Sequence, residues 1–439
     1  MKNVVKSSSN KWTKRQMLIL AGIWFAFLIS FITRLSWATI MPSAIDSLHF
    51  TVQQGNTYVT AFYIGYAITV LPGGMLADKF GYKKLLLSAV AGNLVVMFAM
   101  IFMYGYWEGL ILRFVLGLVS GPDLSACLGI ITEWFDGKKR ATATGIFNTC
   151  TSFGLTVINL YAPVVLVHYG WRAAFAVTAF FPLAALIFSY FAIKGTPPFP
   201  QQLGIKEKSG TIKSESSITR LKKAINNRSV WMLAITGLFA TGVKWGVTNW
   251  ANLFIVKSLK FNLVIAGTAV SIFGITSVIS MIVAGWISDH SQWPRHIWAA
   301  IFMAIFTPTI VGFTLIPHGN LALLYFWTGA MGVGAFMFST ITNELSVEVA
   351  PSDQRGTVSG FINAFNQVGS FIAPVILGQI LATTGSYVSS YLIISVFPII
   401  AVVALLFVRE SDADENVVEQ KNVGQVSKNN VRQATKGEF

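Results

Sequence analysis

Residues 74–78 read Gly-Met-Leu-Ala-Asp, and a matching string, Gly-Trp-Ile-Ser-Asp, occupies residues 285–289, which lie 211 positions further along. A second pair of strings repeats at nearly the same separation, since RATATGIFN begins at Arg140 and RGTVSGFIN begins at Arg355, 215 positions later. Similarity at a single period indicates that the chain consists of two related halves. In each half the Gly-x-x-x-Asp spacing allows close helix packing and places a carboxylate on the same helix face.

Apolar segments flank these strings on both sides. The 439 residues are 54% hydrophobic and 11% charged, whereas soluble domains contain roughly 25% charged residues, so a lipid bilayer is the expected solvent. A transmembrane helix requires ~20 predominantly apolar residues. Twelve segments satisfy this requirement, at 17–41, 57–77, 85–106, 108–133, 142–167, 171–193, 230–256, 264–288, 296–316, 321–343, 357–384 and 388–408. The sequence therefore predicts an all-α membrane protein whose twelve transmembrane helices form two six-helix bundles.

Polar segments divide the chain into five parts. They are predicted to be a cytoplasmic N-terminal tail (1–16), an N-terminal six-helix bundle (17–193), a cytoplasmic linker (194–229), a C-terminal six-helix bundle (230–408) and a disordered cytoplasmic tail (409–439). With both termini in the cytoplasm, 26 of the 32 lysines and arginines lie on that side, in agreement with the positive-inside rule. The first apolar stretch is too long for a signal-peptide h-region, so we expect no cleavable signal peptide.

Composition argues against several other classes of protein. The net charge of +14 is distributed over loops between apolar segments, so it gives no reason to expect a nucleic-acid partner. Cys127 and Cys150 lie in apolar segments and have no metal-binding or redox spacing. The five histidines lie in loops or at helix ends, without an HExxH string or a pair of acids at catalytic spacing. We therefore expect no metal, no cofactor and no enzymatic activity.

Three cations interrupt the apolar segments: Arg34, Arg113 and Lys244. Arg34 and Lys244 are 210 positions apart, so they occupy equivalent places in the two halves, and a pseudo-two-fold arrangement would bring both to one central cavity. A charge at such depth costs ~3 kcal/mol or more unless a partner, water or ligand compensates it. The pair is predicted to bind an anion, and the alternatives are a permanent ion pair or snorkelling to an interface. For Arg113, near the start of its segment, both snorkelling toward the outer face and ligand binding stay open.

Uncharged polar and aromatic residues lie near these cations. The predicted substrate-binding set therefore also contains Tyr63, Tyr66, Trp245, Asn249 and Asn366, although interhelical hydrogen bonding is the commoner role of such residues. Asp123, ten residues beyond Arg113, is an acid away from the ends of its segment. It is predicted either to neutralise a cation or to carry a proton.

The strings around these residues resemble the major facilitator superfamily. GGMLADKFGYKK from Gly73 matches the signature of that family between its second and third helices, with Asp78, Lys79 and Gly81 in register. More narrowly, RLSWATIMPSAIDSLHF, AFYIGYAITVLPGG, RFVLGLVSGP and HYGWRAAF resemble the anion:cation symporter family, which includes hexuronate, galactonate, sialic acid and vesicular glutamate carriers. KWGVTNW from Lys244 resembles the seventh helix of the organophosphate:phosphate antiporters.

The resemblance implies roles for individual residues. It implies anion binding by three cations and a tyrosine, namely Arg34, Arg113, Lys244 and Tyr66. The proton-carrying glutamate of the symporters falls at Ser120, so proton coupling stays open, with Asp123 as the candidate carrier. A gate on the cytoplasmic side is expected from the repeated strings, formed by Gly74, Asp78, Lys79, Gly81, Arg140, Asp289 and Arg355.

The leading hypothesis is a secondary transporter of a small organic anion, a sugar acid or other carboxylate, that works by alternating access in the plasma (inner) membrane. By resemblance we expect a monomer surrounded by membrane lipid. Three alternatives stay open: an organophosphate or anion exchanger, a multidrug exporter, and a transporter-like nutrient sensor. The stretch GIFNTCTSFGLTVINLYAP from Gly145 lacks the Gly-Pro signature of antiporters that export drugs, and the tail from Arg409 has no sign of a folded signalling domain.

Overall fold

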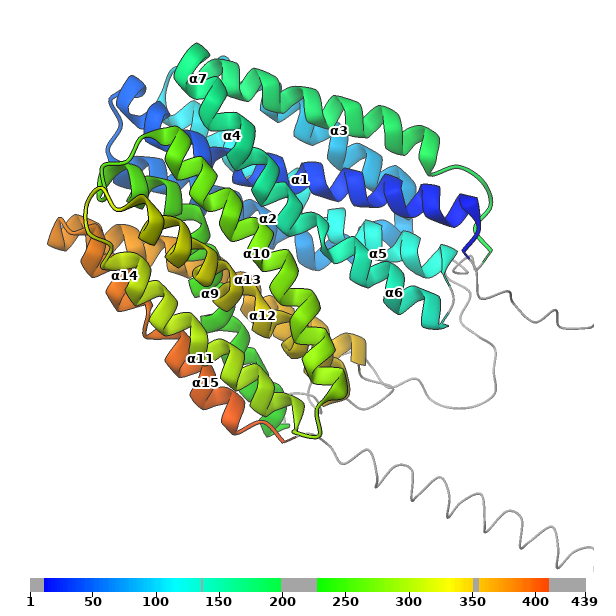
Figure 1. Ribbon diagram of the computed structural model, residues 1–439. Coiled ribbons are helices and arrows are strands. Elements are labelled where there is room, and N and C mark those ends of the chain that lie inside the picture. Colours follow the sequence, from blue (N-terminus) through cyan, green and yellow to red (C-terminus); the bar gives the residue numbers. More distant parts are fainter. Residues whose placement is uncertain (1–11, 136, 199–226, 350–354, 410–439) are drawn as a thin grey trace, which may run out of the picture.

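The computed structural model describes residues 12–135, 137–198, 227–349 and 355–409, and these ranges are almost entirely helical (Figure 1). The first half contains α1 (Lys14–Leu48), α2 (Val52–Phe80), α3 (Tyr82–Met100), α4 (Tyr106–Ser120), α5 (Asp123–Trp134), α6 (Gly137–Asn148) and α7 (Cys150–Ala192). The second half contains α9 (Arg228–Lys257), α10 (Leu263–His290), α11 (Arg295–Thr314), α12 (Leu321–Glu348), α13 (Arg355–Thr384), α14 (Tyr387–Ile394) and α15 (Phe397–Leu406).

The helices confirm the predicted all-α membrane fold. Within the described ranges, ten helices are long and apolar enough to cross a bilayer. The longest of these, 142–192, contains Gly170 in a non-helical conformation (φ 77°), so it consists of two spans joined across a kink. The 29-residue α2 is not among the ten, yet at 1.5 Å per residue it is about 44 Å long and can also cross the bilayer. Together these helices correspond to the twelve predicted segments.

Several predicted boundaries are wrong. The first helix is longer than the predicted 17–41, because Thr13 and Gln16 form a capping box at its start and the helix continues to Leu48. The predicted segment 108–133 is divided into α4 and α5 at Gly121 and Pro122, where proline lacks the backbone N–H that a continuous helix requires. The last predicted segment is likewise divided, into α14 and α15.

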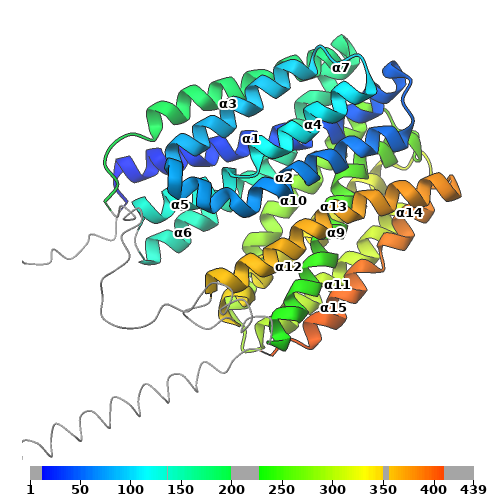
Figure 2. The ribbon, with the colours of Figure 1, turned by 180° about the vertical axis from the view of Figure 1, so that it is seen from behind.

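The two halves lie side by side and diverge toward one end (Figures 1 and 2). The inner end is the end of the molecule at which α1 starts and α15 stops. The outer end is the opposite one, at which α1 stops and α2 starts. Contacts between the halves join α2 to α13, α7 to α10 and α1 to α9. Both views show the halves close together at the outer end and separated at the inner end, where α5 and α6 lie.

Polar side chains connect the halves toward the outer end. The amide of Asn56 on α2 donates a hydrogen bond to the Pro374 carbonyl oxygen on α13 (2.6 Å), and its oxygen accepts one from Trp250 Nε1 on α9 (2.9 Å). Asn252 on α9 donates to Asn159 on α7 (2.7 Å). All four of these side chains are buried, so the bonds are shielded from water and hold the outer end closed.

Within each half, some helices approach so closely that only glycine fits. A Cβ atom at Gly65 of α2 would lie 2.2 Å from the Phe114 carbonyl oxygen of α4. In the second half, a Cβ atom at Gly369 of α13 would lie 1.9 Å from the Leu238 carbonyl oxygen of α9. Small residues at helix crossings are typical of membrane bundles, because association there depends on close packing. Each half is therefore a tightly packed unit.

Candidate functional site

A cavity of about 260 Å³ lies between the two halves, beside the middle of α1 and α9. Its walls combine aromatic rings with amide and hydroxyl groups. The aromatic residues are Phe27, Phe31, Tyr66, Trp245, Phe336 and Phe338. The polar residues are Arg34, Asn148, Thr151, Thr236, Thr241, Lys244, Ser339, Thr342, Asn343, Ser346, Asn363, Asn366 and Gln367. A mixed lining of this kind is typical of small-molecule sites, in which apolar walls confine the ligand and polar groups orient it.

Arg34 enters the cavity from α1. Only 6% of its surface is exposed, and its Nε and Nη2 atoms have no hydrogen-bond partner among the described residues. Aromatic faces surround the guanidinium instead, with its Cζ 4.3 Å from the centre of the Tyr66 ring and 4.5 Å from that of Phe31. Cation–π contacts stabilise a buried charge in part but leave its N–H donors unused. Arg34 therefore retains donors for a ligand.

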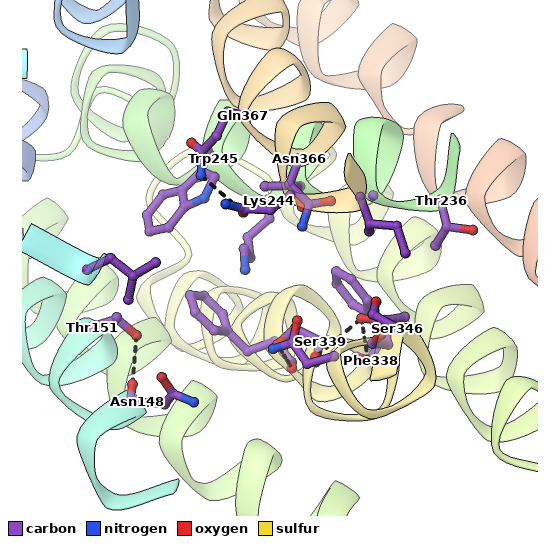
Figure 3. Close-up of a pocket in the computed structure, with 18 of the residues that line it drawn as sticks. Asn148, Thr151, Thr236, Lys244, Trp245, Phe338, Ser339, Ser346, Asn366 and Gln367 are labelled. Carbon is purple, nitrogen blue, oxygen red and sulfur yellow. Dashed lines mark hydrogen bonds between the residues drawn. The ribbon is translucent and has the colours of Figure 1, made fainter. Parts of the chain in front are cut away.

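Lys244 enters the same cavity from α9. Figure 3 shows its side chain extending into the space between Trp245 on one side and Phe338 and Ser339 on the other. The ammonium nitrogen lies 4.7 Å from the centre of the Phe336 ring and 5.4 Å from that of Trp245. Within the described part of the chain, neither Lys244 nor Arg34 forms an ion pair. The alternative of a permanent ion pair is thus not found among the described residues.

Arg113 has a different environment. Its side chain is 1% exposed, so the structure does not show the snorkelling toward the outer face that the sequence left open, and Arg113 is not among the residues that line the cavity. The guanidinium instead donates to three backbone carbonyl oxygens, those of Arg34 (3.1 Å), Tyr58 (3.4 Å) and Thr33 (3.5 Å). These bonds connect α4 to α1 and α2 beside Arg34. Arg113 is therefore placed to fix the backbone of α1 that carries Arg34.

Asp123 lies at the start of α5, 1% exposed, and accepts a hydrogen bond from the Ser30 hydroxyl through Oδ2. Its Oδ1 atom has no partner. Ser30 precedes Arg34 by four residues on α1, so the two lie on one helix face. Asp123 does not line the cavity itself, although the following residue, Leu124, does. The carboxyl group is thus separated from the cations but close to the α1 surface that carries one of them.

The other predicted binding residues divide into two groups. Tyr66, Trp245 and Asn366 line the cavity, and the Asn366 Oδ1 atom is buried without a partner. Tyr63 and Asn249 do not line it; Asn249 Nδ2 donates to the Tyr63 hydroxyl (3.3 Å) and to the Trp245 carbonyl oxygen (2.7 Å). For Tyr63 and Asn249 the structure thus shows the interhelical hydrogen bond that the sequence left open.

Sequence reasoning missed the contribution of α12. Ser339, Thr342, Asn343 and Ser346 all line the cavity from this helix. Their spacing of three or four residues places them on one face of an otherwise apolar helix, which is the signal that could have identified them.

A second cavity, of about 1110 Å³, lies toward the inner end. Tyr63, Ile64 and Ser125 line it from the first half, and Ser359 and Gly360 line it from the second. Both cavities share lining residues, namely Leu124, Asn148, Asn343, Ser346, Ile362, Asn363, Asn366 and Gln367. Because the hydrogen bonds described above close the outer end, the site is approached from the inner end.

The predicted gate is only partly described. Arg140 donates hydrogen bonds to the Thr132 (3.2 Å) and Phe135 (3.3 Å) carbonyl oxygens, Lys79 is exposed, and Gly81 adopts φ 86°, a conformation that favours glycine. The side chains of Asp78, Asp289 and Arg355, and the surroundings of Gly74, lie outside what the structure describes. The predicted pairing of these aspartates with Arg140 and Arg355 therefore stays a prediction.

Residues 23–374 match the model of the Major Facilitator Superfamily, and the chain belongs to this family of membrane transporters rather than to a family of enzymes. Its fold is similar to the inward-facing, occupied crystal structure of a bacterial homolog to the human lysosomal transporter Spinster, with a TM-score of 0.74 and 13% identity over 92% of this chain and 100% of that one. Both the predicted family and the predicted fold class are confirmed.

The curated relatives belong to the groups that the sequence resembled. The chain is 25% identical to the probable galactarate/D-glucarate transporter GudP of Escherichia coli over 80% of this chain and 84% of that one. It is 23% identical to the probable hexose phosphate transport protein of Chlamydia trachomatis over 86% of this chain and 87% of that one. It is also 23% identical to the membrane sensor protein UhpC of Salmonella typhimurium over 83% of this chain and 85% of that one. The first two names refer to transport of organic anions, and the third names a membrane sensor.

Proposed function

We propose that this protein is a secondary transporter of a small organic anion, with a sugar acid as the preferred substrate class. One observation carries the proposal: Arg34 and Lys244, from equivalent positions of the two halves, line one cavity without an ion pair among the described residues. Two cations at this depth without a carboxylate partner among the described residues need compensation, which a bound anion would supply. An anion bound between them contacts both halves simultaneously, as alternating access requires.

The chemistry of the lining favours a hydroxylated carboxylate. The Arg34 guanidinium can bind a carboxylate through two parallel hydrogen bonds, and Lys244 supplies a second, more compact charge. Amide and hydroxyl groups of α12 and α13, such as Asn343 and Asn366, can bind sugar hydroxyls. The cavity beside the two cations has a volume of about 260 Å³, which suits a small anion, and it shares lining residues with the larger inner cavity.

In this proposal the inner end faces the cytoplasm and the protein lies in the plasma (inner) membrane. The two halves rock about the central site, so that the outer hydrogen bonds break when the inner cavity closes. Asp78, Asp289, Arg140 and Arg355 form the inner gate. Asp123, attached to the Arg34 helix through Ser30, is the candidate proton carrier if transport is proton-coupled.

A ligand screen tests the proposal. We expect one class of anion, among sugar acids, dicarboxylates, amino acids, sulfonates and phosphate esters, to raise the melting temperature of the purified protein, because a ligand that binds only the folded state stabilises it. Arg34→Ala and Lys244→Ala should remain folded and lose at least about tenfold in ligand affinity, since a charge-assisted bond contributes roughly 1.5–3 kcal/mol.

The control is Lys260→Asn, which removes an exposed lysine from an outer loop and replaces it by a residue that tolerates its positive φ of 62°. This variant should respond to the ligand like the wild type. The proposal fails if no anion stabilises the protein, or if the Arg34 and Lys244 variants respond as strongly as the control does.

Exchange of phosphate esters is the second candidate. It is favoured by the similarity to a probable hexose phosphate transport protein and by the resemblance of the KWGVTNW string from Lys244 to the seventh helix of the organophosphate:phosphate antiporters. The same screen separates the sugar-acid transporter from the phosphate-ester exchanger. The exchanger is supported if hexose phosphates and inorganic phosphate stabilise the protein and sugar acids do not. A sensor related in function to UhpC would bind the ligand yet fail to transport it into proteoliposomes.

A further inference from the structure

Three cations converge on the surface of the first half at its inner end. Arg15 lies at the start of α1, Lys83 at the start of α3, and Lys194 just beyond the end of α7. Arg15 Nη2 donates a hydrogen bond to the Lys194 carbonyl oxygen, and Lys83 Nζ donates one to the Tyr190 carbonyl oxygen (3.4 Å). Residues far apart in sequence thus form one basic cluster, which we define as Arg15, Lys83 and Lys194.

Two aromatic rings accompany the basic cluster. The ammonium groups of Lys83 and Lys194 lie 5.2 Å and 5.5 Å from the centre of the same Tyr190 ring, and Lys194 Nζ lies 4.5 Å from the centre of the Phe191 ring. Tyr190 and Phe191 are 52% and 58% exposed, and in a membrane protein such rings on a helix surface contact lipid. The cluster therefore lies at the boundary between the bilayer and water.

Among the described residues, no carboxylate pairs with the basic cluster. In the part of the chain that the structure describes, none of the three cations forms an ion pair. Two ammonium groups that share one ring repel each other, so a bound anion would stabilise the arrangement. The cluster is also separate from the central cavity, because its residues are not among those that line that cavity and α3 packs against α1, α2, α4, α5 and α7 of the first half. Its ligand is therefore distinct from the transported anion.

We propose that Arg15, Lys83 and Lys194 bind the phosphate of an anionic phospholipid headgroup in the leaflet at the inner end. Guanidinium and ammonium groups are the usual partners of phosphate, and clustered basic residues next to a transmembrane helix attract anionic lipids. The exposed Tyr190 and Phe191 rings select a lipid over a free phosphate ion, because they offer an apolar surface to the glycerol and upper acyl chain. This site does not depend on the identity of the transported substrate.

The test uses the full-length protein, stripped of lipid in neutral detergent and titrated with short-chain phosphatidylglycerol, phosphatidylcholine or soluble glycerol 3-phosphate. Native mass spectrometry counts bound lipid, and the melting temperature reports stabilisation. We expect phosphatidylglycerol to bind and stabilise, with little effect of phosphatidylcholine. Lys83→Gln and Lys194→Gln should each weaken phosphatidylglycerol binding about fivefold, which is the typical contribution of one basic residue near an anionic surface. Lys260→Asn is the matched control.

Each outcome bears on the assignment. If both glutamine variants bind phosphatidylglycerol as tightly as Lys260→Asn does, the proposed site is wrong. If glycerol 3-phosphate raises the melting temperature as much as phosphatidylglycerol does, the occupant is not a lipid. Lys194→Gln alone suffices if the Lys83 variant fails to fold, because Lys194 lies beyond the helix end and its carbonyl oxygen still accepts from Arg15. The response to the transported anion should be unchanged in either variant, so that failure of the lipid site is distinguishable from failure of the transport site.

Discussion

Arg34 and Arg113 are both buried arginines of the first half, but their guanidinium groups differ in hydrogen bonding. Arg113 donates to three backbone carbonyl oxygens, whereas the Nε and Nη2 atoms of Arg34 have no partner. Both guanidinium carbons lie within 5.3 Å of the centre of the Phe62 ring. The structure thus separates a cation that positions backbone from a cation that is available to a ligand.

This difference predicts opposite effects of one substitution at the two residues. Arg113→Met should lower the stability of the ligand-free protein by about 1–3 kcal/mol, because it removes interhelical hydrogen bonds. Arg34→Met should leave that stability unchanged or raise it, because it removes an uncompensated buried charge. Thermal unfolding in the same detergent measures both. A larger loss of stability for Arg34→Met than for Arg113→Met would contradict the assigned roles.

At the scale of helices, the outer closure consists of two kinds of contact. The first is buried hydrogen bonding, in which Asn56 forms a bridge from α2 to both α9 and α13, and Asn252 on α9 donates to Asn159 on α7. The second is an ion pair between Asp46 at the end of α1 and Lys257 at the end of α9 (2.6 Å), with the Asp46 side chain 64% exposed. Because exposed ion pairs contribute only ~0–1 kcal/mol, the buried bridge should dominate.

We therefore expect Asn56→Ala to open the outer end more than Asp46→Ala does. Loss of two interhelical hydrogen bonds removes about 1–3 kcal/mol from the closed state, which changes a two-state ratio by a factor of roughly 5 to 160. Spin labels at Gln53 on α2 and Thr383 on α13, both exposed at the outer end, allow the distance between the halves to be measured. Asn56→Ala should add a population at longer distance. Equal distance distributions for the two variants would show that the closure depends on other contacts.

Helix boundaries were the least predictable feature at this scale. Hydropathy located every segment, but it could not predict that Thr13 and Gln16 would cap α1 three residues before the apolar stretch, because capping involves polar residues. It also could not predict the near-continuous α7, in which Gly170 alone connects two predicted spans. Both features depend on local backbone hydrogen bonding and conformation rather than on the apolar pattern.

The whole molecule is open toward the inner end, where the larger cavity lies between the halves. Ser359 lines this cavity, and both native cysteines, Cys127 and Cys150, are buried. We expect Ser359→Cys to react with a membrane-impermeant maleimide in inside-out vesicles and to be protected in right-side-out vesicles. Saturating ligand should slow the reaction.

Thr383→Cys is the control for sidedness, because Thr383 is exposed at the outer end of α13. It should react in right-side-out vesicles and be protected in inside-out vesicles. The proposed orientation is wrong if the two positions label from the same side or with reversed sidedness.

The two-fold repeat explains how much of the molecule could be predicted. The equal spacing of the repeated strings and of Arg34 and Lys244 was enough to predict two bundles and to place both cations at one cavity, because symmetry relates positions without detailed packing. The role of Arg113 could not be predicted, because its partners are backbone carbonyl oxygens that every residue carries. The same limit applies to the basic cluster, whose members come from the starts of α1 and α3 and from the segment that follows α7.

The two unpaired cations of the central cavity also have an electrical consequence. Each elementary charge that crosses the field of the membrane changes the free energy by ~2.3 kcal/mol per 100 mV. A doubly charged anion held by Arg34 and Lys244 makes the site neutral, so the loaded protein can reorient with little effect of voltage. The empty site would carry two more positive charges through part of the field than the loaded site does. Membrane voltage would therefore act mainly on the return of the empty protein, and exchange of one anion for another would avoid that step.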